Sequence, residues 1–505
     1  MRSTFHGIEV SKRGLFAQQS ALNTTGHNIA NANTEGYTRQ RVNMQATTGL
    51  PYVGLNTSVE PGLLGTGVNV VGIQRIREEF LDVQLRSENK HFGYWEAKSD
   101  GLLKIETIMN EPSDTGLQKV MDQFWQSWQD LSQHPETAST RAVVLQRGIA
   151  LQETFASLST SLKEMQRDFD NVVRIKALDI NSIAKQISDL NDQIGDVVPH
   201  GYQPNDLLDQ RDVLIDKLSK MIDVKVTPAN DGMVNITIDD QPLVNGRTMV
   251  EMQVAANPIT GFNDITLGGA SFIPKSGSLA GVYETRGTAT VTNGQIQYSG
   301  VIPDMIKRLD TLAANLTQQL NDAHRKGMTL TDVKAGNNAP SDIPFFVDAD
   351  DPTKSPTSAS KIMVNPLIAA NTNNIAAATP GQTTSTSFEG DGSNALEMSK
   401  IKFKVINILN LDGTQGESTS LDDYYRYMIA KLGIESQESQ RMEKNSEILT
   451  GQVENQRQSV SGVSIDEEMS DMVKYQHAYS ASARVMTSMD EILDKVINGM
   501  GRVGL

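Results

Sequence analysis

Residues 137–194 decide the fold class, and they read TASTRAVVLQRGIALQETFASLSTSLKEMQRDFDNVVRIKALDINSIAKQISDLNDQI, without a proline. Apolar side chains alternate steps of three and four residues at Phe155, Leu158, Leu162, Met165, Phe169 and Val172. After a one-residue phase shift near Lys176 the rhythm resumes at Ile180, Ile183, Ile187, Leu190 and Ile194. This spacing is typical of helices that pack in coiled coils. At about 1.5 Å per residue the helix would be roughly 85 Å long, so it must belong to a long helical bundle.

The segments on either side supply further bundle helices. Helical periodicity is found in five other runs: about 75–109, 117–131, 204–222, 303–327 and 421–460. We therefore assign residues 76–223 to the first part of a helical bundle domain, 301–327 to one bundle helix and 396–460 to the last part of the bundle.

Between these helices the pattern changes to the alternation of short strands. Val234, Ile236 and Ile238 alternate after an Asp-Gly turn, and a second alternating run follows an Asn-Gly turn. Residues 224–300 are therefore predicted to form a β-rich outer domain. Residues 328–395 are rich in Gly, Pro, Asn, Ser and Thr, and we expect a second, variable outer region of irregular or β structure there.

Each end of the chain carries a helix with an apolar residue at every seventh position. In the first helix, predicted over 4–33, these residues are Ile8, Leu15, Leu22 and Ile29. In the last helix they are Ile465, Met472, Tyr479, Met486 and Leu493. Ser464 to Glu467 fits a capping box at the start of that last helix. We assign 1–35 to an N-terminal axial helix, 36–75 to an extended arm and 461–505 to a C-terminal axial helix.

The predicted fold is thus mainly α with inserted β: terminal coiled-coil helices, a long helical bundle, and β-rich outer domains inserted in the middle. The two terminal stripes most simply pair with each other or with neighbouring copies of the chain. The amides of Asn28, Asn31 and Asn33, at the end of the first helix, have two interpretations. They can cap the helix and form a turn, or they can fix the register of packed helices by specific hydrogen bonds.

Composition and motifs exclude several classes of function. The 505-residue chain has a net charge of -16, which argues against generalised binding to nucleic acid or anionic membranes. It has no cysteine, and its seven histidines form no HExxH motif. It has no GxxxxGK[ST] phosphate loop and no GxSxG elbow. The sequence therefore predicts no catalytic residue, no cofactor and no metal ion, and it favours protein partners.

The sequence predicts neither a membrane span nor a cleaved leader. Its longest apolar runs are far shorter than the roughly 20 residues that cross a bilayer. The polar N-terminus has no continuous apolar segment of the length that a secretory signal needs. We therefore expect a protein that stays in the cytosol or leaves by a route that reads no cleaved signal.

Two segments resemble a known family. TTGHNIANANTEGYTRQRV (24–42) and SVSGVSIDEEMSDMVKYQHAYSASARV (459–485) are similar to the two ends of flagellar axial proteins, the rod, hook and junction subunits. The pattern ANxNTxGY at 30–37 is common to that family, whereas TRQR at 38–41 and SGVSIDEE at 461–468 resemble the hook-filament junction members. Residues 205–212 also resemble a landmark of those members, and residues 288–300 look like an insertion relative to them.

The resemblance implies a non-enzymatic structural subunit of the bacterial flagellum that forms the junction between hook and filament. It implies export, unfolded and without signal cleavage, by the flagellar type III apparatus, and hence a secreted, extracellular location. The implied partners are copies of the chain in a ring, the hook subunit, the second hook-filament junction protein and an export chaperone. The terminal stripes and the three asparagines would be assembly contacts, and the chaperone would bind Met472, Tyr479, Met486 and Leu493.

Three other functions stay open from the residues alone. A hook or distal-rod subunit of the same family would share both ends of the chain. A cytosolic coiled-coil scaffold would not be secreted, and a wall-hydrolysing enzyme carried on the flagellum would act on purified peptidoglycan.

We also expect each terminal helix to bury too little surface to offset its ordering entropy, so that the ends are disordered in the monomer and order on assembly.

Overall fold

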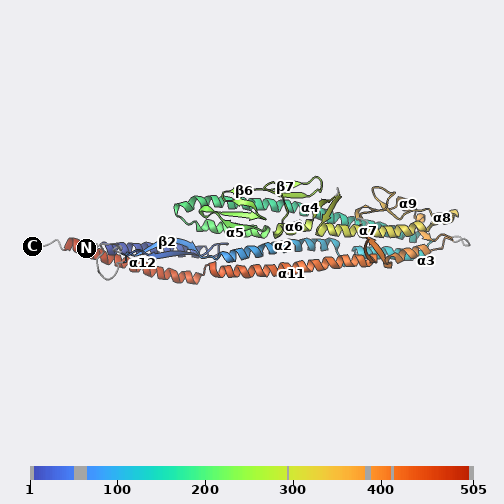
Figure 1. Cartoon of the computed structure of the whole chain (residues 1–505). Coiled ribbons are helices and arrows are strands. Elements are labelled where there is room, and N and C mark those ends of the chain that lie inside the picture. The colour runs from blue at the N-terminus through green and yellow to red at the C-terminus, as the bar shows by residue number, and fades with distance from the viewer. Residues whose placement is uncertain (1–4, 50–64, 293–294, 382–387, 411–414, 500–505) are drawn as a thin grey trace, which may run out of the picture.

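The computed structural model describes residues 5–49, 65–292, 295–381, 388–410 and 415–499, and it is dominated by long helices. These are α1 (His6–Ala30), α2 (Glu79–Met109), α3 (Leu117–Gln133), α4 (Ala138–Val197), α5 (Asn205–Met221), α7 (Val301–Lys326), α11 (Leu421–Ser461) and α12 (Ile465–Asp494). Figure 1 shows an elongated molecule with α12 near one end and α3 near the other. The predicted fold class, mainly α with inserted β, is confirmed.

At one end of the molecule the first and last helices lie together with a β ribbon. Strands β1 (Gln40–Ala46) and β2 (Val68–Arg75) pair antiparallel, and the ribbon packs along α1. The segment predicted as an extended arm is therefore a hydrogen-bonded ribbon, and its residues 50–64 lie outside the described residues. Helix α12 continues into a π-helical turn, Lys495–Gly499. We call α1, β1, β2 and α12 the terminal module, and residues 79–461 the body.

The body is built around the antiparallel pair α2 and α11. Near the start of α11 the Tyr425 hydroxyl donates to Glu111, just beyond the end of α2, over 2.9 Å. Near the end of α11 the Arg457 guanidinium lies 3.6 Å from Asp82, in the first turn of α2. Small side chains at Ser436 and Ser439 are buried along α11, and they let the backbones of neighbouring helices approach.

Helix α4 spans the long periodic stretch, and its buried stripe explains the phase shift in the sequence. Phe155, Leu162 and Phe169 are buried as the periodicity predicts. The next buried positions are Val173 and Ala177, so two steps of four residues in succession rotate the stripe around the helix. The stripe then resumes at Ile180, and the neighbouring Asn181 donates to the carbonyl oxygen of Met252, at the start of β7.

The predicted β-rich segment 224–300 contains two small antiparallel sheets. One joins β3 (Lys225–Pro228), β4 (Val234–Ile238), β5 (Gln241–Asn245) and β6 (Thr248–Met249) in that order. The other joins β7 (Met252–Ala256), β8 (Asn263–Leu267) and β9 (Ala270–Phe272). A hairpin of β10 (Thr288–Thr292) and β11 (Gln295–Ser299) follows.

The same segment contains a helix that the sequence analysis did not predict. Helix α6 (Gly277–Arg286) is buried at every position except Glu284, so it has no polar face and no amphipathic period to detect. An added Cβ at Gly281 would lie 2.5 Å from the carbonyl oxygen of Tyr94 on α2. The missing side chain therefore allows α6 to pack directly on the backbone of α2.

Residues 328–395 are not the outer region that we predicted, because they pack into the core at the end of the body. The short elements are β12 (Met328–Thr329), α8 (Leu330–Ala335), β13 (Phe346–Asp348), β14 (Ile362–Val364), α9 (Pro366–Ala370), β15 (Ala376–Ala378) and α10 (Ser393–Lys400). Phe345 and Phe346 are fully buried, and the Phe345 ring lies 5.3 Å from the ring of Trp128 on α3. Residues 382–387 lie outside the described residues.

A further hairpin and five single turns complete the fold. β16 (Ile406–Leu409) pairs with β17 (Gln415–Thr419) and was not predicted. The 3-10 turns are Val198–His200, Asn230–Gly232, Ala359–Lys361, Thr372–Asn374 and Ile401–Phe403.

A buried histidine ties α7 to the end of the body. Nδ1 of His324 lies 2.6 Å from the carbonyl oxygen of Ile343, and Nε2 accepts from the backbone N–H of Ala376 over 3.0 Å. A carbonyl only accepts, so Nδ1 carries the proton and the ring is neutral. Burial lowers the pKa of His324 from 6.5 to about 4.

This site predicts a loss of stability in mild acid. The unfolded chain binds a proton at His324 below pH 6.5 and the folded chain does so only near pH 4, so stability falls as the pH drops between these values. Across this pH range the free energy of unfolding falls by on the order of 3 kcal/mol. In urea unfolding at pH 7, 6 and 5, His324→Asn should show a shallower loss than the wild type. Equal slopes for both chains would contradict the assignment.

Candidate functional site: the paired ends of the chain

Helices α1 and α12 pack antiparallel along a seam of small residues. An added Cβ at Gly7 would lie 3.0 Å from the Met489 side chain, and one at Gly14 would lie 3.1 Å from Oγ of Ser482. Farther along, Nδ2 of Asn28 donates to Glu468 over 3.0 Å. Each step of seven along α1 is thus matched by a step of seven back along α12. The predicted pairing of the two terminal helices with each other is confirmed.

The structure corrects the position of the seam on α1 by one residue. Gly7, Gly14 and Asn28 contact α12, and Ala21, at the step of seven between them, is buried. By contrast, four bulky residues are half-buried beside the seam: Ile8, Leu15, Leu22 and Ile29. The missed signal is present in the sequence, because the small residues also recur at intervals of seven. Bulky side chains dominate a hydrophobic pattern, but small ones permit the closest approach of two helices.

The predicted stripe on α12 divides into covered and uncovered positions. Leu493 is buried at 7% exposure, and Met472 and Met486 are half-buried. Tyr479 and Ile465 are exposed at 39% and 47%. The described part of α12 buries only Glu468 and Leu493 fully, so α1 alone does not cover its apolar surface.

Asn28 is the buried hub of the terminal module. Its Nδ2 donates to Glu468 and, over 2.9 Å, to the carbonyl oxygen of Gln40. Its Oδ1 accepts from the Tyr37 hydroxyl over 2.8 Å and from the backbone N–H of Gln40 over 3.0 Å. Asn28 therefore fixes register, whereas Asn31 donates to the carbonyl oxygen of His27 at the end of α1 and Asn33 is exposed beyond it.

Arg39 joins the two sequence blocks that carry the family resemblance. Its guanidinium donates to Glu468 over 2.7 Å and to Glu467 over 2.6 Å, and its backbone N–H donates to the carbonyl oxygen of Ser461 over 2.8 Å. Burial disfavours the charge on Arg39, but the two carboxylates outweigh that effect and raise its pKa. The predicted capping box is wrong, because Ser464 makes no side-chain cap and Glu467 binds Arg39 instead.

A network of buried ion pairs joins the terminal module to the body. Along one face of α5 lie Asp209, Asp212 and Asp216, at helical spacing. Four arginines from other elements converge on them and on Asp82: Arg75, Arg77, Arg86 and Arg457. The closest contacts to Asp209 and Asp212 come from Arg75, at 2.7 and 2.8 Å.

The network favours the charged form of the Asp212 carboxyl despite its burial. Burial opposes ionisation of Asp212, but Arg77, Arg75 and Arg86 outweigh it and hold the pKa of that carboxyl below its ordinary value. Sequence analysis singled out 205–212 as a landmark without a role. The structure shows that this segment supplies the aspartates that hold the chain where it passes from β2 into α2.

The outer surface of α12 carries apolar side chains on both sides of the seam. In the half nearer the body, Met469 and Val473 are exposed at 57% and 52%. In the far half, Val485 and Ile492 are exposed at 48% and 55%. Such a surface is typical of a helix that packs against further helices in an assembly.

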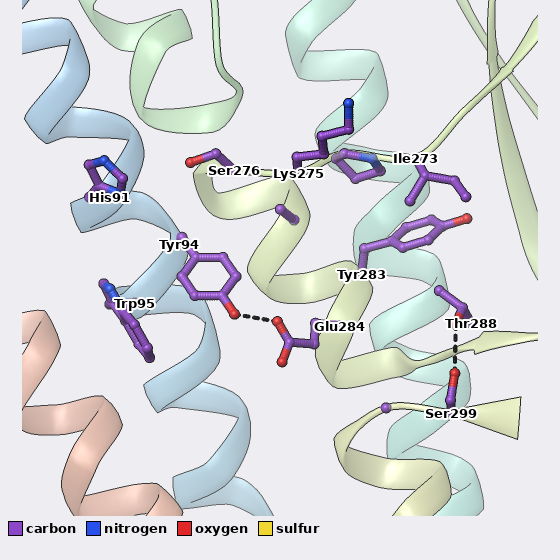
Figure 2. Close-up of a pocket in the computed structure, with 13 residues that line it drawn as sticks. His91, Tyr94, Trp95, Ile273, Lys275, Ser276, Tyr283, Glu284, Thr288 and Ser299 are labelled. Carbon is purple, nitrogen blue, oxygen red and sulfur yellow. Dashed lines mark hydrogen bonds between the residues drawn. The ribbon is translucent and has the colours of Figure 1, made fainter. Parts of the chain in front are cut away.

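A cavity of about 520 Å³ lies between α2, α6 and the base of the β10–β11 hairpin, and Figure 2 shows the residues that line it. The Tyr94 hydroxyl donates to Glu284, which also pairs with Lys98 at 2.9 Å. Burial and the bond to Glu284 raise the pKa of Tyr94 to about 12. Thr288 and Ser299 bond each other across the opening over 3.0 Å. These side chains satisfy one another's hydrogen-bonding groups, which is typical of a structural contact.

The described residues contain neither a cluster of metal ligands nor a helix suited to a membrane. No group of three or more His, Cys, Asp or Glu side chains in that part of the chain is placed to hold a metal ion. Within the same residues, no helix is both long enough and apolar enough to cross a membrane.

The two ends of the chain match families of flagellar axial subunits. Residues 8–38 match the model described as "Flagella basal body rod protein", and 454–499 match "Flagellar basal body rod FlgEFG protein C-terminal". Both matches fall mainly on the terminal module. The fold and the paired ends therefore define a subunit of the flagellar axis.

The sequence of the body identifies the particular family within this class of flagellar subunits. Residues 102–339 match the "Flagellar hook-associated protein FlgK helical domain". The flagellar hook-associated protein 1 of Bacillus subtilis is 39% identical over 99% of both chains, and that of Escherichia coli is 27% identical over 97% of this chain and 99% of its own. The chain belongs to the flagellar hook-associated protein 1 family, whose members are structural proteins and not enzymes.

A solved structure of a relative has the same fold. The flagellar hook junction protein FlgK of Burkholderia pseudomallei aligns with a TM-score of 0.58 at 15% identity, over 74% of this chain and all of the solved chain. This likeness supports the arrangement of helices and inserted strands.

The ion pair between Arg39 and the buried Glu468 predicts that substitutions at Glu468 and at Glu467 have unequal effects on the stability of α12. Glu468→Ala leaves Arg39 without its buried partner and Asn28 without an acceptor, which should cost roughly 3–5 kcal/mol locally. Hydrogen exchange in α12 should rise strongly while exchange in α4 stays unchanged.

Glu467→Ala is the matched control, because Glu467 also pairs with Arg39 but is 63% exposed. An exposed pair contributes at most about 1 kcal/mol, so this variant should exchange almost like the wild type. Equal effects of the two substitutions would show that Glu468 does not hold the terminal module.

Proposed function

We propose that this protein forms the junction between the flagellar hook and filament as a ring of its own copies, assembled through the terminal module. The observation that carries the proposal is the outer apolar surface of α12, which α1 leaves uncovered. Lateral packing of neighbouring terminal modules would cover it. The name shared by the relatives and their match along nearly the whole chain support the place in the flagellum.

The proposal extends to the partners and to the route of the protein. The hook subunit lies on one side of the ring and the second hook-filament junction protein on the other. The chain is exported unfolded by the flagellar type III apparatus and acts outside the cell. Limited burial on α12 supports this route, because ends with little intrinsic stability unfold readily for transport.

The assembly residues follow from the same geometry. Asn28 holds α1 and α12 together, and Leu493 is buried in the single chain. Six further positions are half-buried and complete their burial in the ring: Ile8, Leu15, Leu22, Ile29, Met472 and Met486. Ile465 and Tyr479 are exposed and face neighbouring copies. Asn31 and Asn33 shape the turn that leads from α1 to the ribbon.

Before export, the apolar side of α12 is covered by a chaperone. Met472, Tyr479, Met486 and Leu493 form the proposed contact surface. A helix with such a stripe fits a hydrophobic groove, and flexible methionines adapt well to that mode of binding.

Assembly should be separable from folding by two acidic substitutions on the outer surface. Met469→Asp with Ile492→Asp places carboxylates at sites that are exposed in the single chain, so the melting temperature should not change. In the ring each buried carboxylate costs several kcal/mol. Cells that carry this variant should make hooks without filaments, as counted by electron microscopy.

The conservative pair Met469→Leu with Ile492→Leu is the control and should restore filaments. Leu493→Asp is a contrasting change, because Leu493 is already buried in the single chain and its loss should disturb the terminal module itself. Normal filaments on cells with the double aspartate variant would rule out this surface as the assembly site.

The chaperone proposal is tested by transfer of the last helix. Residues 460–505, fused to an unrelated soluble domain, should acquire binding to the flagellar export chaperone in a pull-down. The same fusion with Met472→Asp and Met486→Asp should bind at least tenfold more weakly. Binding by the full chain but not by the fusion would place the chaperone site elsewhere.

A further inference from the structure

The β10–β11 hairpin is a two-stranded sheet that the proposed function leaves without a role. Its register runs from the pair Thr288–Ser299 to the pair Thr292–Gln295. Strand β11 also contacts α7, and the Tyr298 hydroxyl donates to the carbonyl oxygen of Thr260 over 3.1 Å. The principal neighbour of β10 is β11, so the outer edge of β10 is not paired with another strand of the described chain.

This hairpin lacks the features that normally protect a free strand edge. Residues 287–300 read GTATVTNGQIQYSG and contain no charged side chain and no proline. Val291 and Ile296, which face each other across the hairpin, are exposed at 51% and 37%. Natural proteins usually block such edges with lysine, proline or a bulge, because an unblocked edge pairs with another chain.

The root of the hairpin shows that it is an appendage of the body. An added Cβ at Gly300 would lie 2.5 Å from the Cα atom of Gly287, so the chain leaves and returns at one point. Figure 2 shows this point at Thr288 and Ser299, beside the cavity. The close approach of Gly287 and Gly300 would let the chain pass directly from α6 to α7 without the strands between them.

We propose that the outer edge of β10 pairs with main chain of a second copy of this chain in the assembled ring. The proposal rests on the ring proposed above. Each copy carries a net charge of -16, so copies repel one another except where their surfaces are neutral or complementary. The hairpin offers a neutral stretch with open hydrogen-bonding groups, which suits contact between identical acidic chains.

The neighbour can be identified by photo-cross-linking in intact flagella. Benzoylphenylalanine replaces Val291 in the full chain, in cells that carry no other copy, and Phe403, which is exposed at the far end of the body, serves as the control position. After irradiation, position 291 should give a product of twice the chain mass that contains only this protein. A product with a different flagellar protein, or no product from flagella that contain the chain, would overturn the proposal.

Removal of the hairpin supplies an independent measurement. A chain without residues 288–299, joined from Gly287 to Gly300, should melt within about 2 °C of the wild type, because a surface appendage contributes little. Its filaments should detach several-fold faster under shear, and Thr290→Lys, which guards the edge with a charge, should act in the same direction.

Wild-type detachment rates for both variants would overturn the edge contact and leave the junction function intact. Absence of the unmodified chain from purified flagella would instead contradict the proposed function.

Discussion

The hydrogen bonds that Asn28 and Arg39 donate to Glu468 join points of the chain that are 440 and 429 residues apart, and the rest of the architecture depends on this closure. Once both ends are fixed side by side, everything between them must leave the terminal module and return to it. The antiparallel pair α2 and α11 makes this excursion, and the inserted sheets pack along its length. The order of elements along the sequence follows this path. Terminal helices lie at both ends of the chain, bundle helices lie inside them, and the inserted strands lie between the bundle helices.

Two different kinds of interaction hold the two parts of the molecule. The body has a continuous apolar core that runs from α2 to α11. The connection to the terminal module depends instead on hydrogen-bonded ion pairs around Asp209 and Asp212. An apolar contact tolerates sliding, whereas a buried carboxylate between arginines is stable only in a narrow geometry. The ion pairs therefore orient the terminal module, and the apolar core stabilises the body.

The sequence predicted the elements whose signal is periodic and missed those whose signal is not. Periodicity located α4 and both terminal helices, because apolar residues recur along one face of each helix. It missed α6, which is buried all round, and it assigned Phe345 and Phe346 to an outer region because glycine and polar residues surround them. The seam at Gly7 and Gly14 was misplaced by one residue, since small side chains carry no hydrophobic weight. The pairing of Arg39 with Glu468 depends on tertiary structure, so local capping rules could not find it.

The choice of small residues for the seam also determines how the ends respond to assembly. Glycine lets α1 and α12 approach closely, but it buries little apolar area, and α12 fully buries only Leu493 among its apolar side chains in the described chain. Met469, Val473, Val485 and Ile492 are about half-exposed, so covering the rest of each side chain would contribute roughly half of the about 1.5–3 kcal/mol that full burial contributes. In the ring that we propose, neighbouring copies would therefore add to the stability that α1 gives to α12. Under that proposal α12 would gain further order on assembly, which would couple the final folding of the chain ends to their arrival at the growing structure.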